Sequence, residues 1–176
     1  MGAHPRGGMK LPGMKLLRQA EQRARPWRNG LGVTWDIASQ PQDTADDAFH
    51  WRVSRAAIVR DSEFSVFAGY DRWITLIQGE GGALRFHDDG ETVMLRRPFL
   101  PLHFDGGRLL DFKLAAGAST VINVMLRRDC GLACDVSVVA PDSDAPPDSG
   151  DALLDDSHVL LRLDAARLLR VRFTAT

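Results

Sequence analysis

Four short segments of the sequence hold the polar side chains whose types and spacing suit ligand chemistry. The first covers residues 25–34, where a proline and two glycines precede a strand-like stretch. Arginine, asparagine and exposed backbone amides in a loop that enters a strand suit an anionic or amide-bearing ligand. The alternative is a tight turn with a surface arginine. The candidate ligand-binding residues of this segment are Trp27, Arg28 and Asn29.

The second segment, residues 51–56, alternates apolar and polar residues. Because side chains i and i+2 share one face of a strand, Arg52 and Ser54 lie on one face and Trp51 on the other. Arg52 and Ser54 face either water or the lumen of a small barrel, where the small Ala56 leaves space. The sequence alone leaves both arrangements open.

The third and fourth segments add one aromatic and two polar candidates. Residues 64–72 contain Phe67 and Arg72, and Asn123 stands alone in the apolar run of residues 121–126. An unpaired buried polar group costs about 1–3 kcal/mol, so Asn123 needs a hydrogen-bond partner. That partner is either the backbone or a ligand.

The sequence lacks the patterns of common metal and cofactor sites. Its five histidines never form His-x-His, and none has a glutamate at a useful spacing. Cys130 and Cys134 make half a zinc site at most, and with no export signal we expect both to be reduced thiols in a cytoplasm. Gly-x-Ser-x-Gly, P-loop and dinucleotide-binding motifs are missing. We therefore predict no metal and no cofactor.

Composition limits the class of partner. The chain has 176 residues, a net charge of −1 and 44% hydrophobic residues. A charge near zero argues against a nucleic-acid partner. No apolar run approaches the ~18–20 residues that span a bilayer, which argues against a membrane protein.

The elements that must position these residues are predicted to be strands. About ten or eleven short stretches, spaced by roughly 8–12 residues and separated by turn residues, are typical of an all-β sandwich or barrel. The two helix candidates are residues 16–25 and 164–167. The predicted strands are residues 33–37, 51–59, 72–77, 83–86, 92–95, 109–114, 119–126, 133–139, 158–163 and 169–173.

Two segments fall outside the strand pattern. Residues 1–13 lack periodicity and are predicted to be a disordered leader or an expression remnant, with structure beginning near Lys15. Residues 140–156 contain six aspartates and neither lysine nor arginine. We interpret them as an exposed acidic loop, either a solvated connector or a regulatory or partner-binding loop.

Taken together, the motifs resemble the HutD/Ves family across residues 14–176. The likeness rests on Pro26 to Gly30 with Thr34, on Trp51-Arg52-x-Ser54-x-Ala56, on Phe64-Ser65-x-Phe67-x-Gly69-x-x-Arg72, and on Asn123 with Met125. The sequence departs from the family at Leu31, where glycine is common, at Arg28, which replaces lysine, and at residues 120–122.

The resemblance implies a metal-free cupin-type fold, a double-stranded β-helix with two small β-barrels in one chain and little helix. We place the division between the barrels near residue 100. It also implies a cytoplasmic bacterial protein that binds a histidine-degradation intermediate, of the formylglutamate or urocanate type, and modulates histidine utilisation or a stress response.

We therefore interpret the chain as a binding protein for a small carboxylate, acting as a monomer or homodimer. Arginines would supply charge, Asn29, Ser54 and Asn123 neutral hydrogen bonds, and Trp27 and Phe67 apolar walls. One alternative is a metal-free cupin enzyme of the isomerase or epimerase type, with Asp71 or His103 as the proton-transfer group. Another is an interaction module that uses the acidic loop. The charged candidates are Arg28, Arg52 and Arg72.

Overall fold

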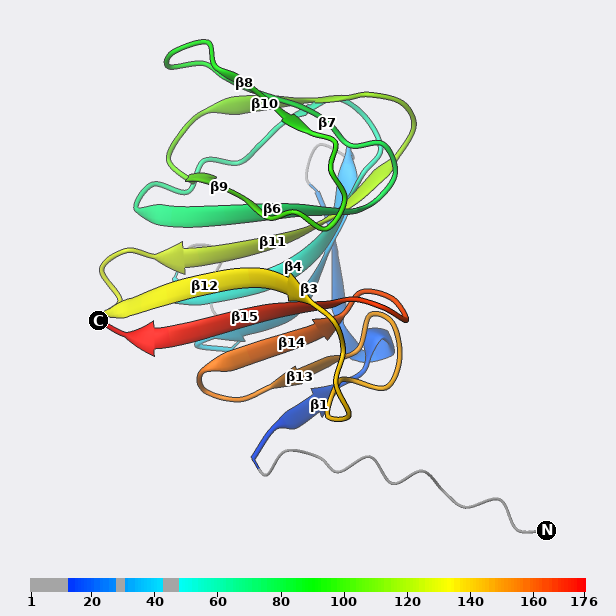
Figure 1. The fold of residues 1–176 in the computed structure, drawn as a ribbon. Coiled ribbons are helices and arrows are strands. Elements are labelled where there is room, and N and C mark those ends of the chain that lie inside the picture. Colours follow the sequence, from blue (N-terminus) through cyan, green and yellow to red (C-terminus); the bar gives the residue numbers. More distant parts are fainter. Residues whose placement is uncertain (1–12, 28–30, 43–47) are drawn as a thin grey trace, which may run out of the picture.

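The computed structural model describes residues 13–27, 31–42 and 48–176, and strands dominate these residues (Figure 1). The strands form three antiparallel sheets. One short 3-10 helix, η1 (Gln19–Glu21), lies near the start. Within the described residues, no helix is long and apolar enough to cross a bilayer. The expectation of an all-β chain with little helix is confirmed.

A six-stranded sheet forms the middle layer (Figure 1). Its order is β2-β3-β4-β11-β6-β9. The strands are β2 (Arg23–Pro26), β3 (Gly32–Gln40), β4 (Trp51–Ile58), β11 (Ser119–Arg127), β6 (Tyr70–Gln78) and β9 (Leu102–Asp105).

The two smaller sheets cover the two faces of the middle layer. The four-stranded sheet, in the order β5-β10-β7-β8, contains β5 (Ser62–Glu63), β10 (Leu110–Leu114), β7 (Gly82–Phe86) and β8 (Thr92–Leu95). The five-stranded sheet, in the order β1-β13-β14-β15-β12, contains β1 (Lys15–Leu17), β13 (Ala152–Leu154), β14 (His158–Arg162), β15 (Leu168–Ala175) and β12 (Leu132–Val139).

Alternation along the central strands separates two apolar cores. In β4, Trp51 and Val53 enter the core shared with β14 and β15, while Ala56 and Ile58 enter the core shared with β7 and β10. Because successive side chains of a strand point to opposite faces, one strand serves both cores. The same alternation directs Arg52 and Ser54 of β4 toward the face that packs against β7 and β10, and Arg55 toward the opposite face.

Two predictions about the fold are corrected by the strand pairing. Residues 16–25 do not form a continuous helix: only η1 is helical, and most of the other residues belong to β1, which pairs with β13, and to β2, which pairs with β3. Residues 164–167 form a bend rather than a helical turn.

The arrangement of two closed barrels is not confirmed, because the strands form three sheets with open edges. A division near residue 100 is not observed either. Strands β9, β10 and β11 all follow residue 100, yet they pair with β6, β5, β7 and β4.

The acidic segment is only partly the exposed loop that its composition suggests. Ala152–Leu154 form β13, and Asp151 is buried. The Asp151 carboxylate accepts hydrogen bonds from Arg18 Nη1 at 2.9 Å and from the Gln19 backbone N–H at 2.8 Å. The predicted leader, residues 1–13, lies outside the described residues except for Gly13, and β1 begins at Lys15.

Candidate functional site

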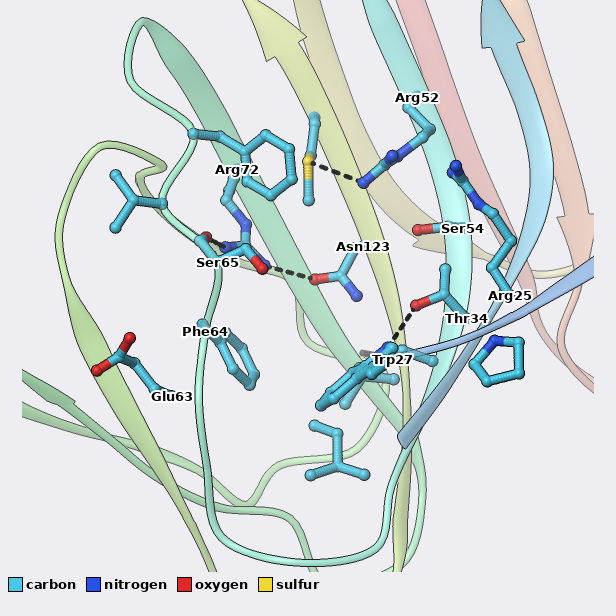
Figure 2. A pocket seen from close by; sticks show the side chains of 17 residues that line it. Arg25, Trp27, Thr34, Arg52, Ser54, Glu63, Phe64, Ser65, Arg72 and Asn123 are labelled. Carbon is cyan, nitrogen blue, oxygen red and sulfur yellow. Dashed lines mark hydrogen bonds between the residues drawn. The ribbon is translucent and has the colours of Figure 1, made fainter. Parts of the chain in front are cut away.

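A cavity of about 540 Å³ opens between the six-stranded sheet and the segment that follows β5 (Figure 2). Strands β2, β3, β4, β6 and β11 supply one wall, and residues 63–67 supply the other. The lining residues are Arg25, Pro26, Trp27, Thr34, Arg52, Ser54, Ala56, Ile58, Glu63, Phe64, Ser65, Val66, Phe67, Arg72, Val121, Asn123 and Met125.

Six of the eight residues selected from the sequence meet around this cavity. The other two, Arg28 and Asn29, lie outside the described residues. That any of the eight binds a ligand stays a prediction. The six are Trp27, Arg52, Ser54, Phe67, Arg72 and Asn123.

Strand register explains why residues distant in sequence come together. In one row across the sheet, Met125 of β11 lies between Arg52 of β4 and Arg72 of β6. In the next row, Ser54 pairs with Asn123. Arg52 and Ser54 of β4 line this cavity, whose walls belong to open sheets rather than to the small closed barrel that the sequence offered as one arrangement.

Arg72 places a guanidinium inside the protein, and its acceptors among the described residues are neutral oxygens. Its Nη1 donates to the Ser65 carbonyl at 3.2 Å and its Nη2 donates to Asn123 Oδ1 at 3.3 Å. Within the described residues no carboxylate forms an ion pair with it, and its buried Nε has no hydrogen-bond partner. Burial, together with the nearby charge of Arg52, lowers the pKa of Arg72 to about 9, so the group is a cation at neutral pH.

Three aromatic rings surround the guanidinium group of Arg72. Its guanidinium carbon lies 5.3 Å from the Phe64 ring centroid, 5.7 Å from that of Phe67 and 5.1 Å from that of Phe104. The negative faces of aromatic rings attract a cation within about 6 Å. They stabilise the charge without neutralising it.

The bond from Arg72 fixes the orientation of the Asn123 amide. Arginine has only donors, so the amide oxygen of Asn123 must face it, and the Nδ2 hydrogens are directed elsewhere. Asn123 is 7% exposed, and Nδ2 makes no hydrogen bond within the described residues. The hydroxyl of Ser54, which is 2% exposed, also makes none there. Both groups lie on the cavity wall and offer donors to its contents.

Arg52 supplies the second cation of the cavity. Its guanidinium carbon lies 4.7 Å from the Phe49 ring centroid and 5.5 Å from that of Phe67. Its Nη2 donates to Met125 Sδ at 3.8 Å. Phe67 is therefore placed between the two guanidinium groups.

Trp27 forms a flat wall of the cavity, and the absence of a side chain at Gly32 leaves room for its indole ring. The Trp27 indole N–H donates to Thr34 Oγ1 at 2.8 Å. A Cβ at Gly32 would lie 2.9 Å from the indole ring and 2.6 Å from the Ala57 carbonyl oxygen. Any larger residue at position 32 would push the ring or the strand away.

Some lining residues were not selected from the sequence. Arg25 reaches the cavity but forms an ion pair with Asp36, with Nε 2.7 Å from Oδ2. Thr34 and Met125 stood inside the recognised motifs, and Met125 shares a face with Asn123, so alternation would have found it. The positions of Glu63 and Ser65 depend on how the segment after β5 folds back, for which the sequence carries no signal.

The groups considered for other chemistry lie away from the cavity. His103 packs on Trp73, with ring centroids 4.6 Å apart, and approaches Asp71. Cys130 and Cys134 pack against the core shared with the five-stranded sheet. Burial, the largest cause, raises the pKa of Cys134 to about 12, with Asp135 and Asp71 adding to it. In the described part of the chain, no three His, Cys, Asp or Glu side chains gather as a metal site would require.

Comparison with known proteins identifies relatives by sequence. The family model named HutD matches residues 19–160. An "uncharacterized 21.2 kDa protein in hutC 3′ region" of Pseudomonas putida is 37% identical over 112 residues, which are 64% of this chain and 57% of that protein. Protein Ves of Citrobacter koseri is 38% identical over 104 residues, 58% of this chain and 52% of that protein. The chain thus spans about half the length of the curated relatives it matches.

Solved structures share the fold. The structure of HutD from Pseudomonas fluorescens SBW25, in a formate condition, has a TM-score of 0.70 and 24% identity, and the match covers 93% of this chain and 99% of that one. A conserved protein of unknown function from Pseudomonas aeruginosa PAO1 has a TM-score of 0.66 and 25% identity, with 92% of each chain covered. These likenesses extend over nearly the whole described fold.

Proposed function

The chain belongs to the HutD family, and from that premise we propose that it binds a small carboxylate in the cavity between β4, β11 and the segment after β5. In this proposal the protein is a cytoplasmic cupin-type binding protein, a monomer or homodimer, that modulates histidine utilisation or a related stress response. The ligand is a pathway carboxylate of the formylglutamate or urocanate type.

The observation that carries the proposal is the Arg72–Asn123 hydrogen bond. It turns the amide of Asn123 so that a donor faces the cavity. Arg52 and the Ser54 hydroxyl add donors on the same face. An ionised carboxylate has hydrogen-bond acceptors and no donor, so it complements a wall of donors.

Charge supports the same class of ligand. The guanidinium groups of Arg52 and Arg72 border the cavity, and Arg25, which also lines it, forms an ion pair with Asp36. Glu63 is the single carboxylate among the described lining residues, and Figure 2 shows it directed away from Asn123. A carboxylate ligand would offset the repulsion between the two arginines.

A thermal-shift and calorimetric screen tests the proposal. The panel is formylglutamate, urocanate, glutamate, formate and unrelated dicarboxylates at constant ionic strength. We expect at least one carboxylate to raise the melting temperature, because a ligand that binds only the folded state stabilises it by mass action. Replacing Arg52 by Ala should weaken carboxylate binding by ~2–5 kcal/mol, since it leaves ligand charge unpaired.

Arg85 provides the matched control. It lies on β7 with an exposed side chain and does not line the cavity. Arg85→Ala should bind carboxylates as the wild type does and change stability by only about 0.5 kcal/mol. If no carboxylate shifts the wild type, or if Arg52→Ala responds as the wild type does, the proposal fails.

The enzymatic alternative is separated from simple binding by turnover. Proton transfer needs a group of tunable pKa within reach of the ligand. Among the described lining residues only Glu63 is of that kind, and His103 lies on Trp73 instead. Conversion of any bound carboxylate, followed by NMR, would favour an isomerase or epimerase over a binding protein.

A further inference from the structure

The cavity changes character along its length, from donor-rich to apolar. The row of Ser54 and Asn123 is followed, two residues further along each strand, by the row of Ala56 and Val121. Both residues of the second row are buried, at 2% and 0% exposure. Beyond this row the lining consists of Ile58, Phe64 and Trp27.

The two ends are visible in Figure 2, where Trp27 and Phe64 lie at one end of the cavity, Arg52 lies at the other, and Asn123 lies between them. A strand rises about 3.4 Å per residue, so neighbouring rows are about 7 Å apart. A carboxylate held by Asn123 and Ser54 therefore has an apolar wall about 7 Å away.

We infer that the site takes a carboxylate with an uncharged, partly apolar body that extends at least about 7 Å from the carboxyl group, and that the small side chain of Ala56 leaves the space that this body enters. The inference rests on the proposed function and narrows it: of the two ligand types named there it favours the urocanate type, because formylglutamate carries a second carboxylate. A cavity of about 540 Å³ leaves space beyond a bare carboxylate. Contact with Ala56, Val121 and the Trp27 indole removes apolar ligand surface from water, which adds affinity.

The nature of the apolar end also predicts what the site rejects. Beyond the Ser54–Asn123 row, the apolar lining side chains among the described residues are Ala56, Ile58, Val121, Phe64 and Trp27. Strand register also places Thr34 and Arg25 in the row of Ala56, where the Arg25 guanidinium is paired with Asp36. The Trp27 indole N–H is engaged by Thr34. A second carboxylate at the far end of a ligand would lose hydration there and would have to compete with Asp36 for Arg25.

A ligand series on the wild-type protein tests the length and charge of the body. Affinities for acetate, 3-phenylpropionate, pentanoate and glutarate are measured by calorimetry at constant ionic strength. We expect 3-phenylpropionate to bind about tenfold or more tightly than acetate, because it buries an aromatic ring. Pentanoate should bind more tightly than glutarate, which has the same length but a charged far end.

Two variants of neighbouring residues test the role of Ala56. Ala56→Leu fills the apolar row and should lower the ratio of 3-phenylpropionate to acetate affinity about tenfold. Ala57→Leu adds the same atoms on the opposite face of β4 and should leave that ratio unchanged. If Ala56→Leu does not fold, Ala56→Val makes a smaller change at the same position. The ligand series tests the inference on the wild-type protein alone.

The outcomes separate this inference from the proposed function. If neither acetate nor any longer carboxylate binds, the proposed function fails and the inference fails with it. If acetate binds but 3-phenylpropionate binds no more tightly, or glutarate binds more tightly than pentanoate, the inference is overturned and the proposed function stands. An equal loss of the affinity ratio in Ala56→Leu and Ala57→Leu also overturns it.

Discussion

Arg72 is stabilised by rings and dipoles rather than by a carboxylate. Phe64, Phe67 and Phe104 surround its guanidinium, and Ser65 and Asn123 accept its hydrogen bonds. An internal acid would stabilise such a cation more strongly, but it would also neutralise the charge. The arrangement keeps a buried cation beside the cavity at the expense of desolvation.

A binding site that retains an uncompensated charge should gain little stability from it. We expect Arg72→Met to change the free energy of unfolding by less than ~2 kcal/mol, because relief of desolvation offsets the two lost hydrogen bonds. The same variant should lose carboxylate binding. Chemical denaturation and calorimetry measure the two effects, and a destabilisation above ~4 kcal/mol would instead show that Arg72 is chiefly structural.

The protonation of Arg72 predicts a pH dependence of binding. Its folded-state pKa of about 9 is well below the ordinary pKa of an arginine side chain. The cation is present below pH 9, so carboxylate affinity should be constant from pH 6 to 8 and fall above pH 9. At pH values between the folded-state pKa and the higher pKa of the unfolded chain, Arg72 binds more protons in the unfolded chain than in the folded protein. Its contribution to the free energy of unfolding therefore rises with pH. Calorimetry from pH 6 to 10 checks the affinity, and a profile that stays level above pH 9 contradicts the prediction.

At the scale of elements, β11 connects the polar parts of the site. It pairs with β4 on one side and β6 on the other, and so places Asn123 between Ser54 and the guanidinium of Arg72. The segment after β5 then closes the cavity, tied by the Arg72 bond to the Ser65 carbonyl and by the Phe67 N–H bond to the Gly106 carbonyl at 2.7 Å. Each wall is thereby held by a different element.

A second set of elements is joined through Asp151. Its carboxylate links the acidic segment to Arg18 and to η1, and the Arg18–Asp148 pair beside it has an Asp148 side chain 78% exposed. We expect Asp151→Ala to lower the free energy of unfolding by about 1–3 kcal/mol, since it removes the two hydrogen bonds that this buried carboxylate accepts.

The control for this prediction is Asp148→Ala. Exposed ion pairs contribute little, so this variant should cost less than about 0.5 kcal/mol. Urea denaturation compares the two variants. Equal effects would show that the carboxylate of Asp151 does not hold the acidic segment and η1 together.

On the scale of the whole molecule, the six-stranded sheet serves two layers at once. One face packs against β14 and β15, and the other packs against β7 and β10 and carries the cavity. Within the described residues, no three histidine, cysteine or acidic side chains gather as a metal site would require. The chemistry of the site thus rests on arginine, amide and hydroxyl donors.

The purified protein should therefore carry well under one equivalent of zinc, iron, nickel or manganese. Tight binding of such ions requires three or four suitably placed nitrogen, sulfur or carboxylate ligands. Elemental analysis after purification without chelators measures the metal content. About one metal ion per chain that persists through dialysis would contradict the prediction.

The sequence alone determined which residues share a face, because strand alternation is local. It placed Arg52 and Ser54 together, singled out Asn123 as a buried polar group, and indicated an all-β chain. Its motifs also carried the family resemblance, which the match over residues 19–160 confirms.

Only the tertiary structure decided which faces meet, because strand pairing joins distant segments. Asn123 takes Arg72 as its partner, 51 residues away, where the sequence left backbone and ligand as the choices. Residues 16–25 have some helical character, but pairing with β13 and β3 makes most of them strand. The hydrogen bonds and apolar contacts that decide these outcomes come from other parts of the chain, so local propensity does not reveal them.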